Sequence, residues 1–172
     1  MEDGRIAEVG TIGNEGMAGL PVFLGAETTP TLAFQQVPGE ALRMRVDAFR
    51  EEVRNDGALT RVLHRYTQAL LTQVAQAAAC NRLHSIGQRC ACWLLMTQDR
   101  VGTDEFELTH EFLGQMLGVR RATVTEVAGT LQEAGLITYS RGKITVLDCQ
   151  GLEAASCECY QVIREEFNRL LR

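Results

Sequence analysis

Apolar residues recur at three- and four-residue steps between positions 58 and 81, the spacing that places side chains on one face of a helix. At about 1.5 Å per residue, this helix would be ~36 Å long. A core helix would give the same stripe, but a helix of this length beside a small N-terminal region has little else to cover it. We therefore predict that the stripe pairs with a second copy of the chain. The predicted dimer interface consists of Leu59, Leu63, Tyr66, Leu70, Val74 and Ala77.

The first 45 residues have a different pattern, in which glycines separate short apolar stretches such as residues 20–24 and 32–34. Such stretches indicate strands and turns, and residues 41–46 alternate as a half-exposed strand does. At ~5–6 residues per strand, the region holds about four strands, which is few for a closed sheet or barrel. We therefore predict a β domain over residues 1–46 that is incomplete at its N-terminus.

Helical periodicity begins at Asp47, which can cap a short helix that runs to about Arg54. With the long helix that follows, it forms a predicted linker and dimerisation unit over residues 47–82. A further helix is expected over residues 85–98, near the start of a C-terminal domain that spans residues 83–172.

Two short helices joined by a glycine turn are expected between residues 109 and 134. Thr109 is a suitable N-cap, Gly118 allows the chain to turn with positive φ, and Gly135 ends the second helix. Two β-prone runs on either side of residues 140–142 then make a hairpin. This order is that of a winged helix-turn-helix, whose second helix can enter the major groove of DNA. The same elements can occur without a role in DNA binding, but their ordered combination favours one.

The outward residues of this motif have side chains that suit DNA. Arginine can bind guanine with two hydrogen bonds, threonine can contact a base edge or a thymine methyl, and glutamate can accept from cytosine N4. Basic side chains at the hairpin tip suit phosphate, which positions a protein without reading sequence. The predicted DNA-binding residues are Arg120, Arg121, Thr123, Thr125, Glu126, Thr109, Arg141 and Lys143.

Net charge limits what kind of nucleic-acid binding is expected. The chain has a formal charge of −5 and a pI near 5.3, which argues against non-specific coating of nucleic acid. Between residues 109 and 146 four basic residues face three acidic ones, so this segment carries +1. No apolar run reaches the roughly 18 residues of a membrane span, and residues 1–8 lack the order of a secretory signal. We therefore expect a cytoplasmic protein without a membrane partner.

Most of the chain resembles the catabolite-activator and Fnr (Crp/Fnr) family of bacterial transcriptional regulators. The resemblance is strongest over residues 108–148, where the sequence contains the pattern Leu-Thr-x-x-x-Leu-Gly-x-x-Leu-Gly followed by Arg-Ala-Thr-Val. Residues 13–25 resemble the later part of that family's effector-binding β-roll. The resemblance implies an α+β chain with a partial, cyclic-nucleotide-binding-like β-roll, a long dimerisation helix and a C-terminal winged helix-turn-helix. It also implies a homodimer whose partners are operator or promoter DNA and RNA polymerase.

Two departures from the family pattern affect what is expected of this chain. Arg121 matches the family's arginine at the start of the recognition helix, but the neighbouring acidic position is Ala122 and a second basic position is Glu126. The cyclic-nucleotide signature also fails, because residues 26–31 contain no arginine that could hold a cyclic phosphate. We therefore predict an altered operator and no response to cAMP, while the effector-binding residues stay unknown.

The six cysteines include two Cys-x-Cys pairs, Cys90 with Cys92 and Cys157 with Cys159. The second pair falls within residues 151–172, where we expect one helix that covers the hairpin domain or adds to the dimer interface. On a helix, residues i and i+2 point about 200° apart, which suits two ligands of one metal poorly. We therefore expect small buried side chains, and neither a metal, an iron–sulfur cluster nor another cofactor.

No catalytic set of nucleophile, base and acid is evident, so we do not expect an enzyme. Glu15, among glycines, is expected to be a turn residue, and His110 a solvent-exposed side chain, with contact to a phosphate as the alternative. The leading prediction is a homodimeric, sequence-specific transcriptional regulator. The alternatives are a cysteine-based redox or metal sensor and an interaction module without tight DNA binding.

Overall fold

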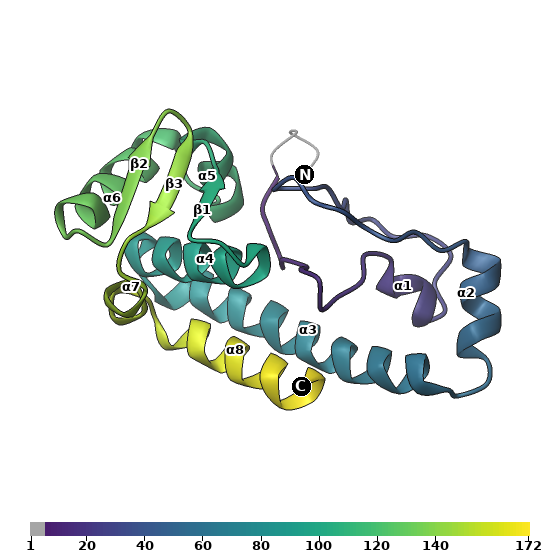
Figure 1. The fold of residues 1–172 in the computed structure, drawn as a ribbon. Coiled ribbons are helices and arrows are strands. Elements are labelled where there is room, and N and C mark those ends of the chain that lie inside the picture. Colours follow the sequence, from purple (N-terminus) through teal and green to yellow (C-terminus); the bar gives the residue numbers. More distant parts are fainter. Residues whose placement is uncertain (1–5) are drawn as a thin grey trace.

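A computed structural model describes residues 6–172 (Figure 1), so the first five residues of the predicted N-terminal domain lie outside it. A compact C-terminal part is built around one central helix, and a long helix extends away from it. The helices are α1 (Leu20–Phe23), α2 (Val46–Val53), α3 (Ala58–Leu83), α4 (Ile86–Val101), α5 (His110–Leu117), α6 (Arg121–Glu133), α7 (Cys149–Ala155) and α8 (Glu158–Leu171). The strands are β1 (Glu105–Glu107), β2 (Ile137–Ser140) and β3 (Lys143–Val146).

The two longest helices meet at a sharp junction. The predicted helix over 58–81 is confirmed as α3, and its extended C-cap residue His84 is followed directly by Ser85, the N-cap of α4. The Ser85 side chain accepts from the backbone of Gln88, while the Gln88 side chain accepts from the backbone of Ser85. This capping box satisfies two of the donors that a helix start leaves free, so α4 begins as a new helix with its own direction.

The small sheet is antiparallel, with the strand order β1-β3-β2. The predicted hairpin is confirmed, since β2 and β3 pair from Ser140 opposite Lys143. Its two turn residues, Arg141 and Gly142, have φ values of 52° and 81°, the primed type of turn that matches the twist of paired strands. Strand β1 was not predicted, because a three-residue strand beside a turn carries too little periodicity.

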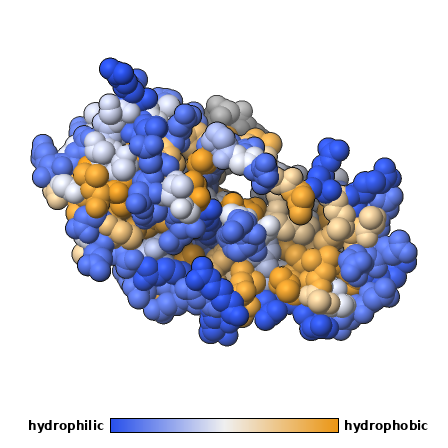
Figure 2. All heavy atoms as spheres, viewed as in Figure 1, coloured by the Kyte–Doolittle hydropathy of each residue, from blue (hydrophilic) through white to orange (hydrophobic). Residues whose placement is uncertain are grey.

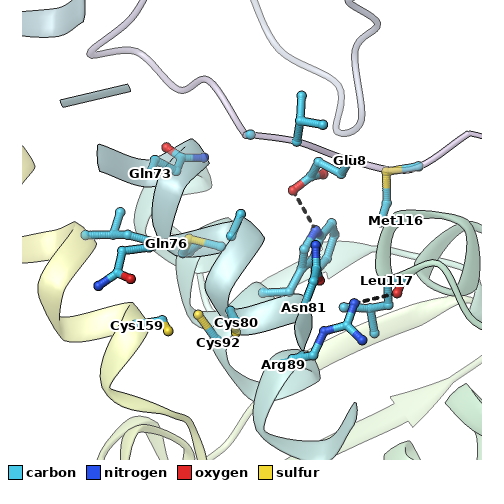
Figure 3. Close-up of a pocket in the computed structure, with 16 residues that line it drawn as sticks. Glu8, Gln73, Gln76, Cys80, Asn81, Arg89, Cys92, Met116, Leu117 and Cys159 are labelled. Carbon is cyan, nitrogen blue, oxygen red and sulfur yellow. Dashed lines mark hydrogen bonds between the residues drawn. The ribbon is translucent and has the colours of Figure 1, made fainter. Parts of the chain in front are cut away.

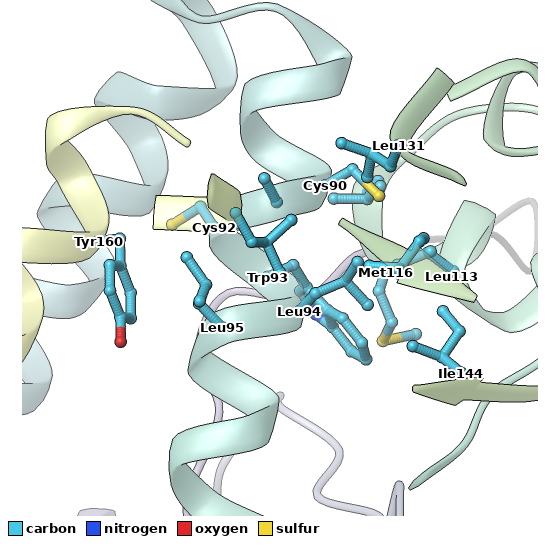
Figure 4. Packing of buried hydrophobic residues seen from close by; sticks show 14 of the residues in the cluster. Cys90, Cys92, Trp93, Leu94, Leu95, Leu113, Met116, Leu131, Ile144 and Tyr160 are labelled. Carbon is cyan, nitrogen blue, oxygen red and sulfur yellow. The ribbon is translucent and has the colours of Figure 1, made fainter. Parts of the chain in front are cut away.

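The core surrounds α4, which contacts α5, α6 and β1 on the motif side and α7 and α8 on the other. Leu94 and Leu95 are fully buried, and Trp93 is nearly so (Figure 4). Because residues 90–95 of this helix are all buried, both sets of elements pack on the same support. The α+β class and the order of long helix, helix-turn-helix and wing are confirmed.

The predicted strands of the N-terminal segment are not formed within residues 6–45. The apolar run at residues 20–24 is instead the short helix α1, with a proline in its first turn. Residues 41–45 form no strand and Val46 already belongs to α2; Leu42 and Met44 are exposed, and no described strand pairs with this stretch. A strand needs a partner for its backbone hydrogen bonds, so an alternating pattern alone does not make one here.

The glycines of this segment do not form turns between strands. They allow the backbone of the segment to lie close to side chains of α3. A Cβ atom on Gly16 would lie 2.6 Å from the hydroxyl oxygen of Tyr66 on α3. Nearby, the buried side chain of Gln73 donates to the carbonyl and hydroxyl oxygens of Thr11. The segment therefore packs against one face of α3. Figure 1 shows this N-terminal segment, with α1, running alongside α3.

The last segment is two helices, not the single helix predicted over 151–172. Ser156 and Cys157 are extended and separate α7 from α8. Helix α7 packs on α4, whereas α8 packs along α3 and also contacts α4. The spacing of the apolar residues is the same for one continuous helix and for two consecutive helices, so the spacing alone did not reveal the break. Among residues 6–172, no helix combines the length and the apolar composition that a membrane crossing requires.

Candidate nucleic-acid interface

Helix α5 begins and ends at the residues that the sequence predicts. The Thr109 side chain accepts from the backbone N–H of Phe112 at 3.1 Å and so caps the first turn. Gly118 follows the helix with φ of 67°, a left-handed conformation that glycine adopts at low cost. A DNA contact by Thr109 stays a prediction, and its side-chain oxygen already has this intramolecular partner.

The turn between α5 and α6 passes very close to α5 itself. A Cβ atom added to Gly114 would lie 3.0 Å from the carbonyl oxygen of Val119 and 3.5 Å from the backbone nitrogen of Arg121. Both neighbouring atoms belong to the backbone, so they cannot rotate away as a side chain would. Glycine at this position therefore sets the spacing between the two helices.

The start of α6 is open to solvent and basic. Its N-cap residue is Arg120, and no side chain caps the first turn. The first backbone N–H groups therefore lack helical partners, and the helix dipole makes this end attractive to an anion. Arg120 and Arg121 are both exposed beside these groups. Together they form the kind of helix terminus that binds phosphate.

His110 joins α5, α6 and the wing in one place. Its Nδ1 lies 3.0 Å from Oγ1 of Thr125 on α6, and its ring stacks on Tyr139 of β2 with centroids 4.0 Å apart. Burial, and secondarily the nearby Arg121 charge, lower the pKa of this imidazole. A lowered pKa favours a neutral ring near pH 7. The expectation of a mostly exposed His110 was wrong, because its neighbours become visible only in the folded chain.

The wing tip lies next to the start of α5. Gly142 approaches the Thr109 side chain, and an open hollow of about 370 Å³ is lined by Thr109, Arg141 and Lys143 among others. Arg141 is exposed at the turn. Lys143 instead donates from Nζ to Oε1 of Glu105 at 2.8 Å, which raises the pKa of Lys143 and lowers that of Glu105. Arg141 is therefore available to bind a phosphate, whereas Lys143 would first have to leave Glu105.

Most predicted DNA-binding residues share this surface. Arg121 is close enough to His110 to affect its pKa, His110 contacts Thr125, and Thr109 borders the wing tip. Thr123 is the exception, because its side chain is half-buried. The other predicted residues, Arg120, Arg121, Thr125, Glu126, Arg141, Thr109 and Lys143, are exposed.

The predicted dimer stripe does not lie on one exposed face of α3. Leu63 and Tyr66 are only 4% and 2% exposed within the single chain. They are buried against the chain itself, so those two residues cannot also contact a second copy in this conformation. The exposed apolar side chains of the helix include Leu71 and Val74. Figure 2 shows apolar side chains gathered on the half of the molecule that holds α3 and the N-terminal segment.

A smaller hollow of about 60 Å³ lies between the N-terminal segment, α3, α4 and α8 (Figure 3). At its edge the Trp93 indole nitrogen donates to the carboxylate of Glu8 at 3.1 Å. Burial raises the pKa of this carboxyl, against the opposing effect of its hydrogen bonds from Gln36 and Trp93. Cys80, Cys92 and Cys159 also line the hollow.

Comparison with known proteins agrees with this geometry. The Crp-like helix-turn-helix domain matches residues 88–155, which include α5, α6 and the wing. A CRP/FNR-family transcriptional regulator from Thermus thermophilus is 27% identical, with a TM-score of 0.52 over 57% of this chain and 54% of that one. No curated protein sequence matches.

Two further structures share the fold at lower identity. FixK2 from Bradyrhizobium japonicum is 18% identical, with a TM-score of 0.56 over 64% of this chain and 58% of that one. A CooA variant from Carboxydothermus hydrogenoformans is 18% identical, with a TM-score of 0.54 over 63% and 54% of the two chains. The chain thus spans little more than half the length of the structures it resembles.

Proposed function

Because residues 88–155 match the Crp-like helix-turn-helix domain, we propose that the chain is a transcriptional regulator of the Crp/Fnr type and a homodimeric reader of a specific DNA site. One observation carries the proposal: the uncapped, basic start of α6 shares an exposed surface with the start of α5 and the wing tip. In this proposal residues 83–172 bind DNA in the cytoplasm, residues 47–82 join two subunits, and the preceding residues respond to an effector.

The DNA contacts divide into those that position the protein and those that read sequence. The free N–H groups at the start of α6 and the guanidinium of Arg141 suit phosphate oxygens. Arg121 and Glu126 are exposed on the part of α6 that would enter the major groove, where arginine prefers guanine and glutamate accepts from cytosine. Thr125 is held by His110, so a contact from its methyl group to thymine is its most suitable role.

Pairing of two chains would use the part of α3 that its own chain leaves uncovered. Leu71 is 60% exposed and Val74 is 38% exposed, and the exposed Ala75 and Ala78 continue the same helical face. This interface shares only Val74 with the stripe that the sequence suggests. A two-fold dimer would place two α6 helices against half-sites about 34 Å apart.

We further propose that cAMP is not the effector. Residues 26–31 are mostly exposed and contain no positively charged side chain that could hold a cyclic phosphate. A phosphate held inside a protein needs charged or well-placed hydrogen-bond donors. DNA affinity should therefore be the same with and without cAMP at fixed salt.

Selection of binding sites from random duplex DNA tests the proposal. The wild-type chain, Arg121→Ala and the control Arg65→Ala are compared at one near-physiological salt concentration. Arg65 is an exposed arginine of α3, outside the helix-turn-helix. We expect the wild type and the control to enrich the same palindrome, and Arg121→Ala to lose it. No enrichment by the folded wild-type chain would contradict sequence-specific binding.

A further inference from the structure

Three thiols and one imidazole converge where the end of α3 meets the start of α8. Ligand atoms of Cys80, His84, Cys157 and Cys159 all lie within 4.8 Å of one another. Cys80 Sγ is 3.4 Å from Cys157 Sγ, and Cys159 Sγ is 3.5 Å from Nδ1 of His84. Figure 3 shows Cys80 and Cys159 facing each other between the two helices. All three cysteines are buried.

These separations are those of ligands around one tetrahedral ion. With Zn–S bonds of about 2.3 Å and a Zn–N bond of about 2.05 Å, tetrahedral geometry puts two sulfurs ~3.8 Å apart and sulfur and nitrogen ~3.5 Å apart. Cysteine and histidine in this ratio form closed structural zinc sites. A cluster of several iron atoms would need its thiolates spread more widely. We propose that Cys80, His84, Cys157 and Cys159 bind a single zinc ion.

The imidazole is already oriented for this role. While Nδ1 of His84 faces the thiols, its Nε2 lies 3.3 Å from Oε1 of Glu158. A carboxylate this close to the second ring nitrogen favours a proton there and leaves the first nitrogen free for a metal, as carboxylates do around zinc-bound histidine. A cluster of cysteines that merely filled space would not need this pairing.

The break between α7 and α8 explains how two cysteines in a Cys-x-Cys pair reach one site. Cys157 is the N-cap of α8, with φ of −98° and ψ of 165°, so it does not follow helical geometry. The expectation that i and i+2 side chains diverge, which rested on one continuous helix, was therefore wrong for this pair. The positive end of the α8 dipole also lies here, where it favours thiolate.

Zinc binding would change the protonation of the cluster. Zinc binds cysteine as thiolate, so forming three Zn–S bonds releases the protons that the three thiols carry, while His84 supplies the Zn–N bond. The affinity should consequently rise with pH.

The position of the site gives it a structural consequence. His84 is the C-cap of α3 and precedes the N-cap of α4, so an ion bound there would tie α8 to the junction between these two helices. The angle at this junction sets how the helix-turn-helix sits relative to α3. Control of DNA binding by zinc rests on the proposed function, whereas zinc binding itself does not.

Metal analysis of the untagged, reduced chain tests the site directly. After loading with zinc sulfate and dialysis, we expect about one zinc per chain and a higher Tm than in chelator-treated protein. Cys159→Ser should lose the metal and the Tm gain, whereas Cys149→Ser, which removes an exposed thiol outside the cluster, should retain both. Glu158→Gln should retain zinc with about tenfold weaker affinity.

A second measurement does not depend on any variant that might fold poorly. Cobalt added to the wild-type chain should give the thiolate charge-transfer band and the strong visible bands of a tetrahedral site. Wild-type protein that retains no zinc after dialysis, or that binds cobalt only with the weak spectrum of an octahedral ion, would overturn the proposal. Equal metal loss in Cys149→Ser and Cys159→Ser would do the same. DNA affinity, measured separately with loaded and stripped protein, reports only on the regulatory consequence.

Discussion

Arg89 on α4 donates from Nη2 to the carbonyl oxygen of Leu117, the last residue of α5, at 2.6 Å (Figure 3). This carbonyl is one of those that the end of a helix leaves without a helical partner. The guanidinium also faces the negative end of the α5 dipole. One side chain thus ties the first helix of the DNA-binding motif to the helix at the centre of the core.

Replacing Arg89 with methionine should weaken this connection. The variant keeps most of the aliphatic stem but removes the charged donor, so the free energy of unfolding should fall by about 1–2 kcal/mol. Urea unfolding followed by circular dichroism measures the change. The control is Arg82→Met, at an exposed position in the last turn of α3, which should change stability by less than about 0.5 kcal/mol. Equal effects of the two substitutions would contradict the assigned role.

Two helical glycines of the motif should respond to alanine with opposite signs. At Gly114 a Cβ would press on the carbonyl oxygen of Val119, so Gly114→Ala should destabilise the chain by about 1–3 kcal/mol. At Gly129, in α6, a Cβ meets nothing within 4 Å, so Gly129→Ala should stabilise it by about 0.5–1 kcal/mol through helix propensity. Thermal unfolding of both variants checks the pair. A stabilising Gly114→Ala would show that the turn can move away from α5.

Local pattern was sufficient for elements whose residues contact near neighbours in sequence. The stripe of α3, the N-cap at Thr109 and the left-handed Gly118 all depend on positions a few residues apart. The hairpin around Arg141 is likewise a local structure with a recognisable turn. Such features can be predicted from period and turn chemistry alone.

Features that depend on distant parts of the chain could not be predicted in this way. The alternation at residues 41–46 resembles a strand, but whether a strand forms depends on a partner elsewhere. Cys80 and Cys157 are 77 positions apart, so only the packing of α8 on α3 brings their sulfurs to 3.4 Å. Leu63 and Tyr66 were assigned to a dimer because nothing local shows that their own chain buries them.

The two basic residues of the wing should affect DNA binding unequally. Each phosphate contact contributes about −0.9 to the slope of log affinity against log salt, so Arg141→Ala should reduce the steepness of that slope by about 0.9. Lys143→Ala should change it less, because Lys143 is already paired with Glu105. Glu105→Gln should free Lys143 and increase affinity at low salt. Fluorescence anisotropy with the selected DNA site, between about 50 and 200 mM salt, measures these slopes.

Equal slopes for Arg141→Ala and Lys143→Ala would contradict this distinction. An unchanged slope in Arg141→Ala would place the wing tip away from phosphate. Because both substitutions lie in a two-residue turn or beside it, near-ultraviolet circular dichroism of each variant should first confirm that the wing is folded.

Glu8 should make the stability of the chain fall as pH rises. Its carboxylate accepts from Trp93 but is buried, and burial raises its pKa above the usual range. Between the ordinary pKa of a glutamate and this raised value, the folded chain binds the proton more tightly than the unfolded chain does. The free energy of unfolding must then decrease with increasing pH across that window and level off above it.

Glu8→Gln removes this titration while retaining an oxygen that can accept from the Trp93 indole. We therefore expect the variant to gain stability relative to the wild type as pH rises above the ordinary pKa of a glutamate, about 4.3, with the difference levelling off above the raised pKa of Glu8. Urea unfolding at a series of pH values gives the difference curve, in which the titration of all other groups cancels. Glu40→Gln, at an exposed position in the same segment, is the control against which the Glu8→Gln difference is compared. A Glu8→Gln curve that is flat, or that slopes the other way, would contradict a raised pKa for the buried carboxyl.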